Sequence, residues 1–463
     1  MTKLDIFIIS SYVVLLFGVG ILVGVRETAE DFLILSRKAR FPLVLFSIVS
    51  TWVGVGMFLG ATASGYDTGV SYSLTGAGGA LVAIVAVSRC APMIKRFGDR
   101  FDAHTLGDFF RIRYSINNQL LVGGIVSTAY LLFTAVQFTG LAAMLNVWTD
   151  IGFETAVLAA ALTTVIYTAF AGIKSDFYTD AVHFWVMVLV LFGLLLPTVW
   201  QSTGGVSGIR QLPESYFSPF AFGGVPFIAA GVLFGTGVAF ISMEIWQRIY
   251  ASESAETARR ALIGSVAFVV AFYVLAAYLG MATKIVEPSL ANRDIALFVL
   301  MKRFLRPGVL GLGIAAFVAV FMSSANTMIM VVSATLTKDF YKGIFNRQAS
   351  QRQLLVAGRC LTFVAGLAGV GFSFVVRDIV TLSVIALFML LVFLPAVIGG
   401  FFWRRATSRG AFLSVLLGFL TSLFLLPRMP RTAFVPGFVV SLLVFVAVSF
   451  LTAHSPSENV HLR

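Results

Sequence analysis

Four oxygen-bearing side chains lie within five positions of an otherwise apolar stretch. They are Ser323, Ser324, Asn326 and Thr327. Because residues three and four apart are neighbours on a helix, these oxygens would cover one helix face and part of the next. Uncharged hydroxyl and amide oxygens suit a weakly held monovalent cation, whereas a calcium site would need several carboxylates. The alternative is that the hydroxyls bond carbonyl groups of their own helix.

Three further polar side chains lie inside apolar runs. Asp180 stands near the start of one run, Glu244 near the end of the next, and Gln137 in the middle of an earlier one. Ionisable groups inside a membrane are costly and are therefore candidates for function. The two carboxylates also lie close in sequence to Lys174 and Arg248, so simple pairing or snorkelling is the alternative. Gln137 can bond either a solute or a neighbouring helix.

The sequence contains no set of residues typical of an enzyme or a metal centre. Among the four histidines, only His183 shares a run with an acid, Asp180 at i, i+3, and no third group accompanies the pair. No phosphate-binding loop sequence is present, so ATP-driven pumping has no support. The two cysteines, Cys90 and Cys360, form neither a disulfide framework nor a metal cluster. We therefore expect a protein that is not an enzyme.

Composition indicates a membrane protein. Of the 463 residues, 59% are hydrophobic and only 12% are charged, whereas soluble domains carry roughly 25% charged residues. The net charge of +12 does not indicate nucleic-acid binding, because the basic residues are dispersed among short loops between apolar runs. That distribution is typical of the positive-inside rule. The expected partner along most of the surface is the lipid bilayer.

About thirteen apolar runs are long enough to cross a membrane as helices. They are expected at 4–24, 42–66, 71–92, 119–147, 152–171, 176–200, 225–247, 261–283, 309–335, 357–376, 379–402, 410–427 and 434–453. If every other loop is assigned to the same side of the membrane, one side holds about two thirds of the basic residues. That side should be cytoplasmic. The N-terminus is then outside and the C-terminus inside. Segment 284–308, which is basic on the other side, is expected to be an external hairpin or surface helix.

Paired glycines interrupt two of these runs. Gly54 and Gly56 lie in the second run, and Gly235 and Gly237 in the seventh. Each glycine lowers helix stability by about 1 kcal/mol relative to alanine. Matching interruptions in two halves are typical of transporters built from inverted repeats, with a site at the membrane midplane. The alternative is that these glycines only allow close helix packing.

The expected fold is therefore an all-α polytopic membrane protein in which two units of five spans are inverted relative to each other. The four parts are 1–41 (first span and cytoplasmic loop), 42–200 (first repeat, spans 2–6), 201–402 (second repeat, spans 7–11) and 403–463 (spans 12–13 and a short cytoplasmic tail). About ten residues follow the last run, which leaves no room for a signalling domain. No residue pattern indicates an oligomeric state.

Five short motifs in the right order resemble the sodium:solute symporter family. They are Gly60–Gly69, Phe170–Asp180, Trp246–Arg248, Ala319–Ser324 and Lys338–Tyr341, spread over roughly 1–450. The resemblance implies a leucine-transporter-type fold with a 5+5 inverted repeat, thirteen spans and broken helices at spans 2 and 7. It also implies sodium-coupled import of a small organic solute by alternating access, at a plasma membrane that is expected to be a bacterial inner membrane.

The resemblance also implies ligands for the coupling ion, Na⁺, between the broken second span and the ninth. The matching groups are the backbone carbonyls of Ser50, Val53 and Val320 and the hydroxyls of Ser323 and Ser324. Some relatives hold a second sodium ion nearer the cytoplasm, and the matching positions are Asp180, Ser323, Asn326 and Thr327. Asn326 stands where a hydroxyl is expected, but its carbonyl can still coordinate an ion.

The chain departs from the family pattern where the solute would bind. Trp52 stands where proline symporters have an aspartate, and Met57 falls about where the galactose symporter has a glutamine. Proline and galactose are therefore disfavoured. The expected solute pocket comprises Thr51, Trp52, Gly54, Met57, Gln137, Phe240 and Ser242. It suits a small, partly apolar solute such as an amino acid or a carboxylate.

Two other functions remain open from the sequence. One is a transporter of the same fold coupled to protons, with Asp180 or Glu244 taking up the charge. The other is a membrane sensor that uses the fold without transporting a solute.

Overall fold

The computed structural model describes residues 2–24, 27–149, 151–375, 383, 385–386, 389–430 and 432–452. Throughout these ranges the elements are helical and none is a β-strand; one isolated bridge joins Ala39 and Ser252. The all-α expectation is confirmed.

The long helices are α1 (Lys3–Gly24), α5 (Ser71–Phe101), α7 (Ile116–Thr149), α8 (Phe153–Met187), α11 (Gly224–Ile241), α13 (Ala255–Val286), α15 (Val309–Thr335), α16 (Gln351–Val375), α19 (Ser408–Leu425) and α20 (Phe434–Leu451). The shorter ones are α2 (Ala29–Ile34), α3 (Phe41–Trp52), α4 (Val55–Thr68), α6 (Leu106–Arg113), α9 (Leu196–Thr203), α10 (Gly205–Ile209), α12 (Met243–Ala251), α14 (Ala296–Phe304) and α18 (Leu394–Phe402). Two π-helical segments, η2 (Val188–Leu195) and η5 (Leu336–Phe345), continue α8 and α15.

Eleven helices in the described ranges are long and apolar enough to cross a membrane, and the bent pair α3 and α4 makes a twelfth span. The expected run 379–402 lies partly outside the described residues, and its described part ends in the shorter helix α18. α8 divides into two spans at Gly172, whose φ of 51° is unusual for any residue with a side chain. The surface helix expected within 284–308 is α14.

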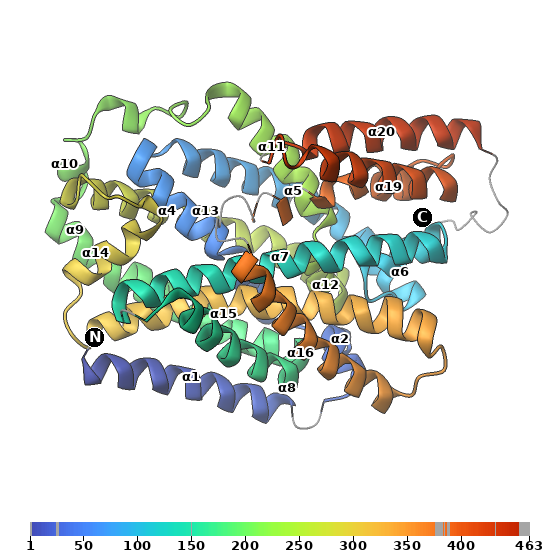
Figure 1. The fold of residues 1–463 in the computed structure, drawn as a ribbon, viewed down its shortest axis with the longest axis horizontal. Coiled ribbons are helices and arrows are strands. Elements are labelled where there is room, and N and C mark those ends of the chain that lie inside the picture. Colours follow the sequence, from blue (N-terminus) through green and yellow to red (C-terminus); the bar gives the residue numbers. More distant parts are fainter. Residues whose placement is uncertain are drawn as a thin grey trace.

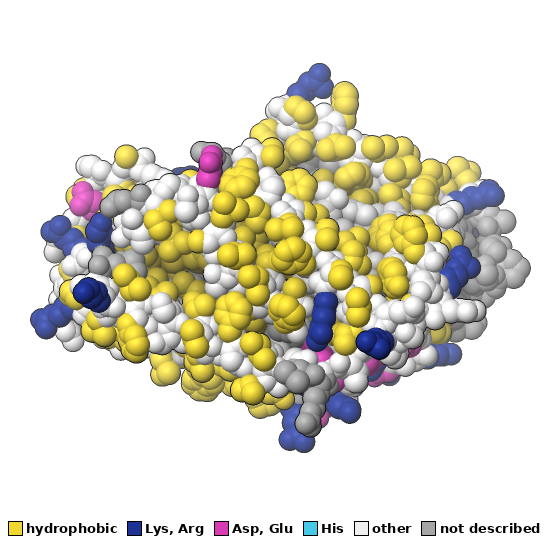
Figure 2. All heavy atoms as spheres, turned by 60° about the horizontal axis from the view of Figure 1, so that its bottom comes forward, with side chains coloured by type: hydrophobic (Ala, Val, Ile, Leu, Met, Phe, Trp, Pro, Cys, Tyr) yellow, Lys and Arg dark blue, Asp and Glu magenta, His cyan; other side chains and the backbone are white. Residues whose placement is uncertain are grey.

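The helix α15 forms the centre of the molecule. Its most apolar stretch is entirely buried, whereas only about a fifth of the corresponding stretches of α1 and α20 is buried. In Figure 1, α15 runs between α1 and α7, and the pair α19 and α20 lies at one edge. Figure 2 shows a broad apolar face with basic side chains mainly at its margins. A polar cluster on α15 is therefore buried at the centre of an apolar, multi-pass membrane protein.

The first predicted break is confirmed. α3 ends at Trp52 and α4 begins at Val55, and the two helices are bent by 52°. Only Val53 and Gly54 separate them. The carbonyl groups in the last turn of a helix have no intrahelical N–H partner, so this break exposes acceptor groups inside the bundle.

The second break is displaced from the predicted position. α11 continues through Gly235 and Gly237 to Ile241, and Ser242 alone is extended before α12 begins. A side-chain carbon on Gly237 would lie 2.8 Å from Leu394 Cδ2. This glycine therefore allows close packing of the neighbouring segment, which was the alternative explanation for the glycine pair.

Candidate functional site

Ser324 connects the central helix to the first break. Its hydroxyl donates to the carbonyl oxygen of Thr51 at 3.2 Å, and the residue is 1% exposed. A side-chain carbon on Gly54 would lie 2.6 Å from Ser324 Oγ. The absence of a side chain at Gly54 thus lets α15 approach the interrupted backbone directly.

Two of the three hydroxyl-bearing members of the predicted sodium set, Ser50 and Ser323, contact Asp180, whereas Ser324 bonds the Thr51 carbonyl. The Ser50 hydroxyl donates to the Asp180 backbone carbonyl at 2.9 Å, and the Ser323 hydroxyl donates to the Asp180 carboxylate. Val53 is the residue after α3, and Val320 lies one turn before Ser324 on α15; both are buried. The five predicted ligands therefore come from two elements, α3 with its C-terminal cap and α15, which pack together.

The second predicted set is only partly assembled. Asp180 and Ser323 are hydrogen-bonded to each other. Asn326 faces elsewhere: its Nδ2 donates to the Tyr167 hydroxyl at 2.6 Å, and its Oδ1 accepts from the Thr168 hydroxyl. Because α15 is helical here, Asn326 points to a different neighbour from Ser323, towards the first half of α8. The structure therefore does not bring Asn326 to the Asp180 carboxylate.

Arg248 on α12 forms the centre of a buried ionic cluster. Its Nη2 lies 3.0 Å from Asp176 Oδ2 and 3.3 Å from Asp180 Oδ2, and its side chain is 1% exposed. Three hydroxyls complete its contacts, those of Ser47 at 3.0 Å, Thr51 at 2.9 Å and Thr327 at 2.6 Å. Arg248 therefore lies inside the protein rather than in an exposed loop. Two carboxylates compensate its charge and make its burial tolerable.

Asp176 is a member of this cluster that the sequence analysis missed. It lies four residues before Asp180, and this i, i+4 spacing places both carboxylates on one face of the second half of α8. Its Oδ1 has no hydrogen-bond partner among the described residues. With both acids ionised, the cluster of Asp176, Asp180 and Arg248 carries one uncompensated negative charge.

The alternative of simple pairing with a basic residue is observed for Asp180, which pairs with Arg248, but not for Glu244. The Glu244 carboxylate accepts from the Tyr130 hydroxyl on α7, and Arg248 reaches only its backbone carbonyl, at 3.5 Å. Lys174 lies 3.7 Å from Asp31 rather than beside Asp180. Glu244 therefore links α12 to α7, away from the Asp176–Arg248–Asp180 cluster.

Gln137 reaches the first break from α7. Its Oε1 accepts from the backbone N–H of Val55 at 3.3 Å, and a side-chain carbon on Gly54 would lie 3.6 Å from the same oxygen. The first N–H groups of a helix lack intrahelical partners, so Gln137 satisfies one at the start of α4. Of the predicted solute residues, Thr51, Gly54 and Gln137 are thus gathered at one place.

The remaining predicted solute residues lie along the two broken spans. Trp52 and Met57 are half-buried near the first break. Phe240 and Ser242 are buried at the second, where the Phe240 carbonyl accepts from Trp246 Nε1 at 2.8 Å and the Ser242 hydroxyl donates to the Val238 carbonyl at 3.0 Å. Trp52 and Met57 therefore lie at the first break and Phe240 and Ser242 at the second. The Phe240 carbonyl and the Ser242 hydroxyl bond within their own segment.

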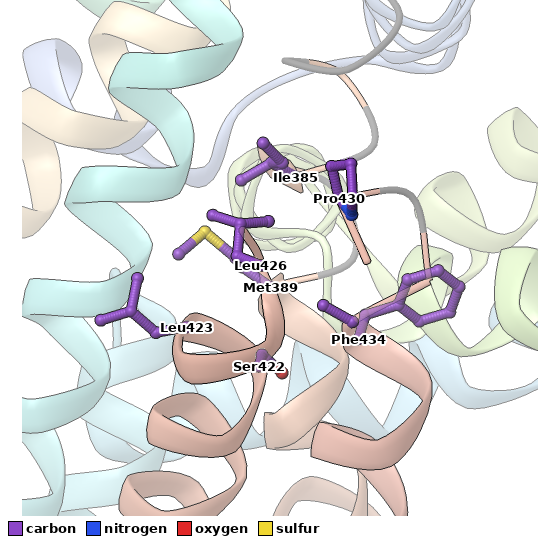
Figure 3. A pocket seen from close by; sticks show the side chains of 8 residues that line it. Ile385, Met389, Ser422, Leu423, Leu426, Pro430 and Phe434 are labelled. Carbon is purple, nitrogen blue, oxygen red and sulfur yellow. The ribbon is translucent and has the colours of Figure 1, made fainter. Parts of the chain in front are cut away.

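A small pocket elsewhere contains none of these residues. It lies between α19, the start of α20 and the residues Ile385 and Met389, and Figure 3 shows its almost wholly apolar lining. Ser422 supplies the single hydroxyl, and Leu423, Leu426 and Phe434 are among the apolar residues. Its volume of about 20 Å³ has room for about one water molecule. It is too small for an organic solute.

Comparisons with known proteins agree with this geometry. A family model described as the sodium:solute symporter family matches residues 39–418, which is more than half of the chain. The sodium/pantothenate symporter of Haemophilus influenzae is 26% identical over 97% of this chain and 95% of its own. The sodium/glucose cotransporter of Vibrio parahaemolyticus is 24% identical over 98% of this chain and 91% of its own.

A similar fold is present in a solved structure of a substrate-bound, outward-open Na⁺-coupled sialic acid symporter. It matches with a TM-score of 0.87 at 17% identity and covers 98% of this chain and 99% of that chain. The fold is of the leucine-transporter type, as expected. The family match favours sodium coupling over the proton-coupled and sensor alternatives. This protein is a transporter rather than an enzyme, with Na⁺ as its coupling ion, and it belongs to the sodium:solute symporter family.

Proposed function

We propose that this protein imports a small, partly apolar organic solute together with sodium by alternating access. In this proposal Na⁺ is held by the carbonyls of Ser50, Val53 and Val320 and the hydroxyls of Ser323 and Ser324. The observation that carries the proposal is the contact of the Ser324 hydroxyl with the Thr51 carbonyl, 3.2 Å away at the broken end of α3.

The chemistry of the first break favours sodium. The last carbonyls of α3 lack helical partners and carry the negative end of the helix dipole. Interrupted helices in transporters use such carbonyls to coordinate Na⁺. Ser323 and Ser324 add neutral oxygens from α15, and the Asp180 carboxyl group lies next to them. Carbonyl and hydroxyl oxygens of this kind can coordinate a monovalent cation and release it again.

We propose that the solute lies against the other side of the same break. Gln137 and Thr51 offer an amide and a hydroxyl, whereas Trp52, Met57 and Phe240 offer apolar contacts. A small amino acid or carboxylate combines both kinds of group. The second set of Asp180, Ser323 and Thr327 is proposed as a further sodium site in which Asn326 does not take part.

The orientation follows from the basic loops. We propose that the loops richer in Lys and Arg face the cytoplasm of a bacterial inner membrane, with the N-terminus outside and the C-terminus inside. The units 42–200 and 201–402 are proposed as the two inverted repeats, each with one broken helix. α3 belongs to the first of these units and α15 to the second. Na⁺ bound between α3 and α15 would hold the two units together, and this step would couple sodium binding to solute transport.

Direct binding of radioactive sodium to the purified protein tests the ion site. Ser323→Ala and Ser324→Ala should each weaken sodium binding by about tenfold or more, since a hydrogen-bond-type contact to a charge is worth about 1.5–3 kcal/mol. Ser333→Ala is the matched control. Ser333 is equally buried on α15, but its hydroxyl bonds Gly358 at 2.9 Å.

The outcomes are distinct. Sodium affinity that falls in the two variants and not in Ser333→Ala supports the site, and potassium should not compete. Unchanged sodium affinity in both Ser323→Ala and Ser324→Ala would place the ion elsewhere and overturn the proposal.

A further inference from the structure

A second cavity, which is polar, lies at the end of the molecule where α5, α6, α7 and η5 meet. We call it the basic cleft and define it by Arg111, Lys338, Lys342 and Arg347, which line it together with Asp102 and Asp108. Its volume is about 620 Å³. Figure 1 shows α6 beside the end of α7 at which the cleft opens. The cavity is large enough for a phosphate-bearing headgroup.

The two acids in the cleft are already engaged. Asp108 accepts from the backbone N–H of His104 at 2.9 Å and from Gln119 Nε2 at 3.3 Å, and Arg111 lies 3.5 Å away. Asp102 accepts from Arg37 at 3.2 Å. These carboxylates therefore have partners of their own and do not neutralise the remaining cations by direct contact.

Three cations of the cleft make no direct polar contact within the part of the chain that the structure describes. Among the described residues, neither a hydrogen bond nor an ion pair is formed by Lys338, Lys342 or Arg347, and Asp108, Asp102 and Glu30 act on Lys338 only through longer-range electrostatics. Lys338 is only 9% exposed. Burying an ammonium group without a partner is costly, so buried charges are normally paired. Three cations without a direct acidic contact around one cavity, one of them nearly buried, form a site for an anion.

The surroundings of the cleft indicate a lipid rather than a soluble anion. Ile344 and Phe345 follow the cleft residues directly and are 45% and 78% exposed, and Ile116 in the cleft wall is 38% exposed. Exposed apolar side chains beside a basic pocket are suited to acyl chains, whereas the pocket is suited to the headgroup. Basic pockets between transmembrane helices bind phospholipid headgroups in this manner.

We propose that the basic cleft binds the phosphate headgroup of an anionic phospholipid. The cleft is separate from the proposed transport site. Lys338 lies eleven residues beyond Thr327 along the same helical segment, which corresponds to about 16 Å at 1.5 Å per residue. The bound lipid would neutralise Lys338 and fix η5 against α6 and α7.

Native mass spectrometry of the full-length protein, released from detergent micelles that contain phosphatidylglycerol, tests this proposal. Wild-type protein should retain one phosphatidylglycerol molecule in preference to phosphatidylcholine. Lys342→Gln/Arg347→Gln, whose side chains are accessible, should lower that retention by about tenfold, and Lys338→Gln should act in the same direction. Arg259→Gln/Arg260→Gln is the control, because it removes the same charge from exposed positions on α13 that pair with Glu256.

Each result decides the question. Loss of retention in the cleft variants with retention in the control supports the proposal. Equal retention in Lys342→Gln/Arg347→Gln and wild type overturns it, provided that both elute as monodisperse protein. Inorganic phosphate at millimolar concentration is the competing ligand. If it displaces the lipid, and if it raises the melting temperature of the protein as much as phosphatidylglycerol does, the site binds free phosphate and the lipid assignment is wrong.

Discussion

The guanidinium group of Arg248 lies 3.0 Å from the carboxylate of Asp176, and both side chains are almost completely buried. Its Nη2, the nitrogen in contact with Asp176, also contacts the hydroxyls of Thr51 and Thr327. These contacts join α12 to the second half of α8, to α3 and to α15. Since α3 and α15 carry the proposed sodium ligands and α12 follows the second break, the Asp176–Arg248 pair ties both broken spans to the ion site.

Arg248→Ala should be strongly destabilising. Removing one partner of a buried ion pair leaves an uncompensated charge and costs about 3–5 kcal/mol, and here Asp176 and Asp180 would both lose their cation. Arg248→Ala/Asp176→Ala should recover part of the loss, because one of the two orphaned carboxylates is also removed. Thermal unfolding of purified protein in detergent measures these effects.

Arg260→Ala provides the comparison for this prediction. Arg260 pairs with Glu256 at 2.7 Å, but it is 70% exposed. Ion pairs of this exposed kind contribute little to stability, so its melting temperature should remain that of wild type. Melting of Arg248→Ala at the wild-type temperature would show that the buried pair does not stabilise the fold.

The helices and the first break were predictable because their signals are local. A run of apolar residues has to be about as long as the membrane is thick, and the polar cluster at Ser323 and Ser324 stands out within such a run. The second break was misplaced because glycine has two uses. Gly54 interrupts a helix, whereas Gly237 lies inside α11 where Leu394 packs closely.

The ionic cluster could not be predicted from local sequence. Arg248 looks like a loop residue until its partner Asp176, 72 positions earlier, is brought to it by the fold. Asn326 shows the same limit. Its neighbours in sequence suggest an ion ligand, yet its helical position directs it to Tyr167 and Thr168. Motif matching gives the type of residue, and only packing decides which neighbour the side chain meets.

Gly54→Ala should impair sodium binding through a steric effect alone. Gly54 has a φ of −100°, which alanine adopts without strain. The new methyl group would lie 2.6 Å from Ser324 Oγ, closer than real contacts allow. Ser324 would have to move away from the Thr51 carbonyl, so we expect sodium affinity to fall by about tenfold or more.

Gly78→Ala is the matched control for that substitution. Gly78 lies within α5, and a side-chain carbon there meets nothing within 4 Å. Alanine should therefore leave sodium binding unchanged, and it favours a helix by about 1 kcal/mol. Equal sodium affinities in Gly54→Ala and wild type would mean that the contact between Gly54 and Ser324 is not needed for the site.

Gln137→Leu should disturb the start of α4. Leucine has a similar volume but cannot accept the hydrogen bond from the Val55 N–H, which is now 3.3 Å from Gln137 Oε1. Leaving a buried donor unsatisfied costs about 1–3 kcal/mol. Once a transported solute is identified by screening, Gln137→Leu should raise its KM for uptake more than Gln137→Glu, which keeps an acceptor. An unchanged KM in Gln137→Leu would remove Gln137 from the solute site.

Glu27, in the loop between α1 and α2, should make stability depend on pH. Burial raises the pKa of Glu27 from 4.5 to about 8. The positive charges of Arg359 and Lys174 act against this rise, and the negative charge of Asp31 adds to it. Among the described residues its carboxylate oxygens have no hydrogen-bond partner. Between pH 4.5 and 8 the folded protein therefore keeps a proton that the unfolded chain releases.

Because the folded state binds more protons in that range, the stabilisation associated with Glu27 is present below pH 4.5 and is lost as the pH rises through about 8. Glu27→Gln remains uncharged at every pH, so its melting temperature should exceed that of wild type by more at pH 9 than at pH 5. Thermal unfolding in detergent at several pH values measures the difference. Parallel curves for the two proteins would show that Glu27 is already ionised in the folded state, with its charge satisfied by Arg359 and Lys174.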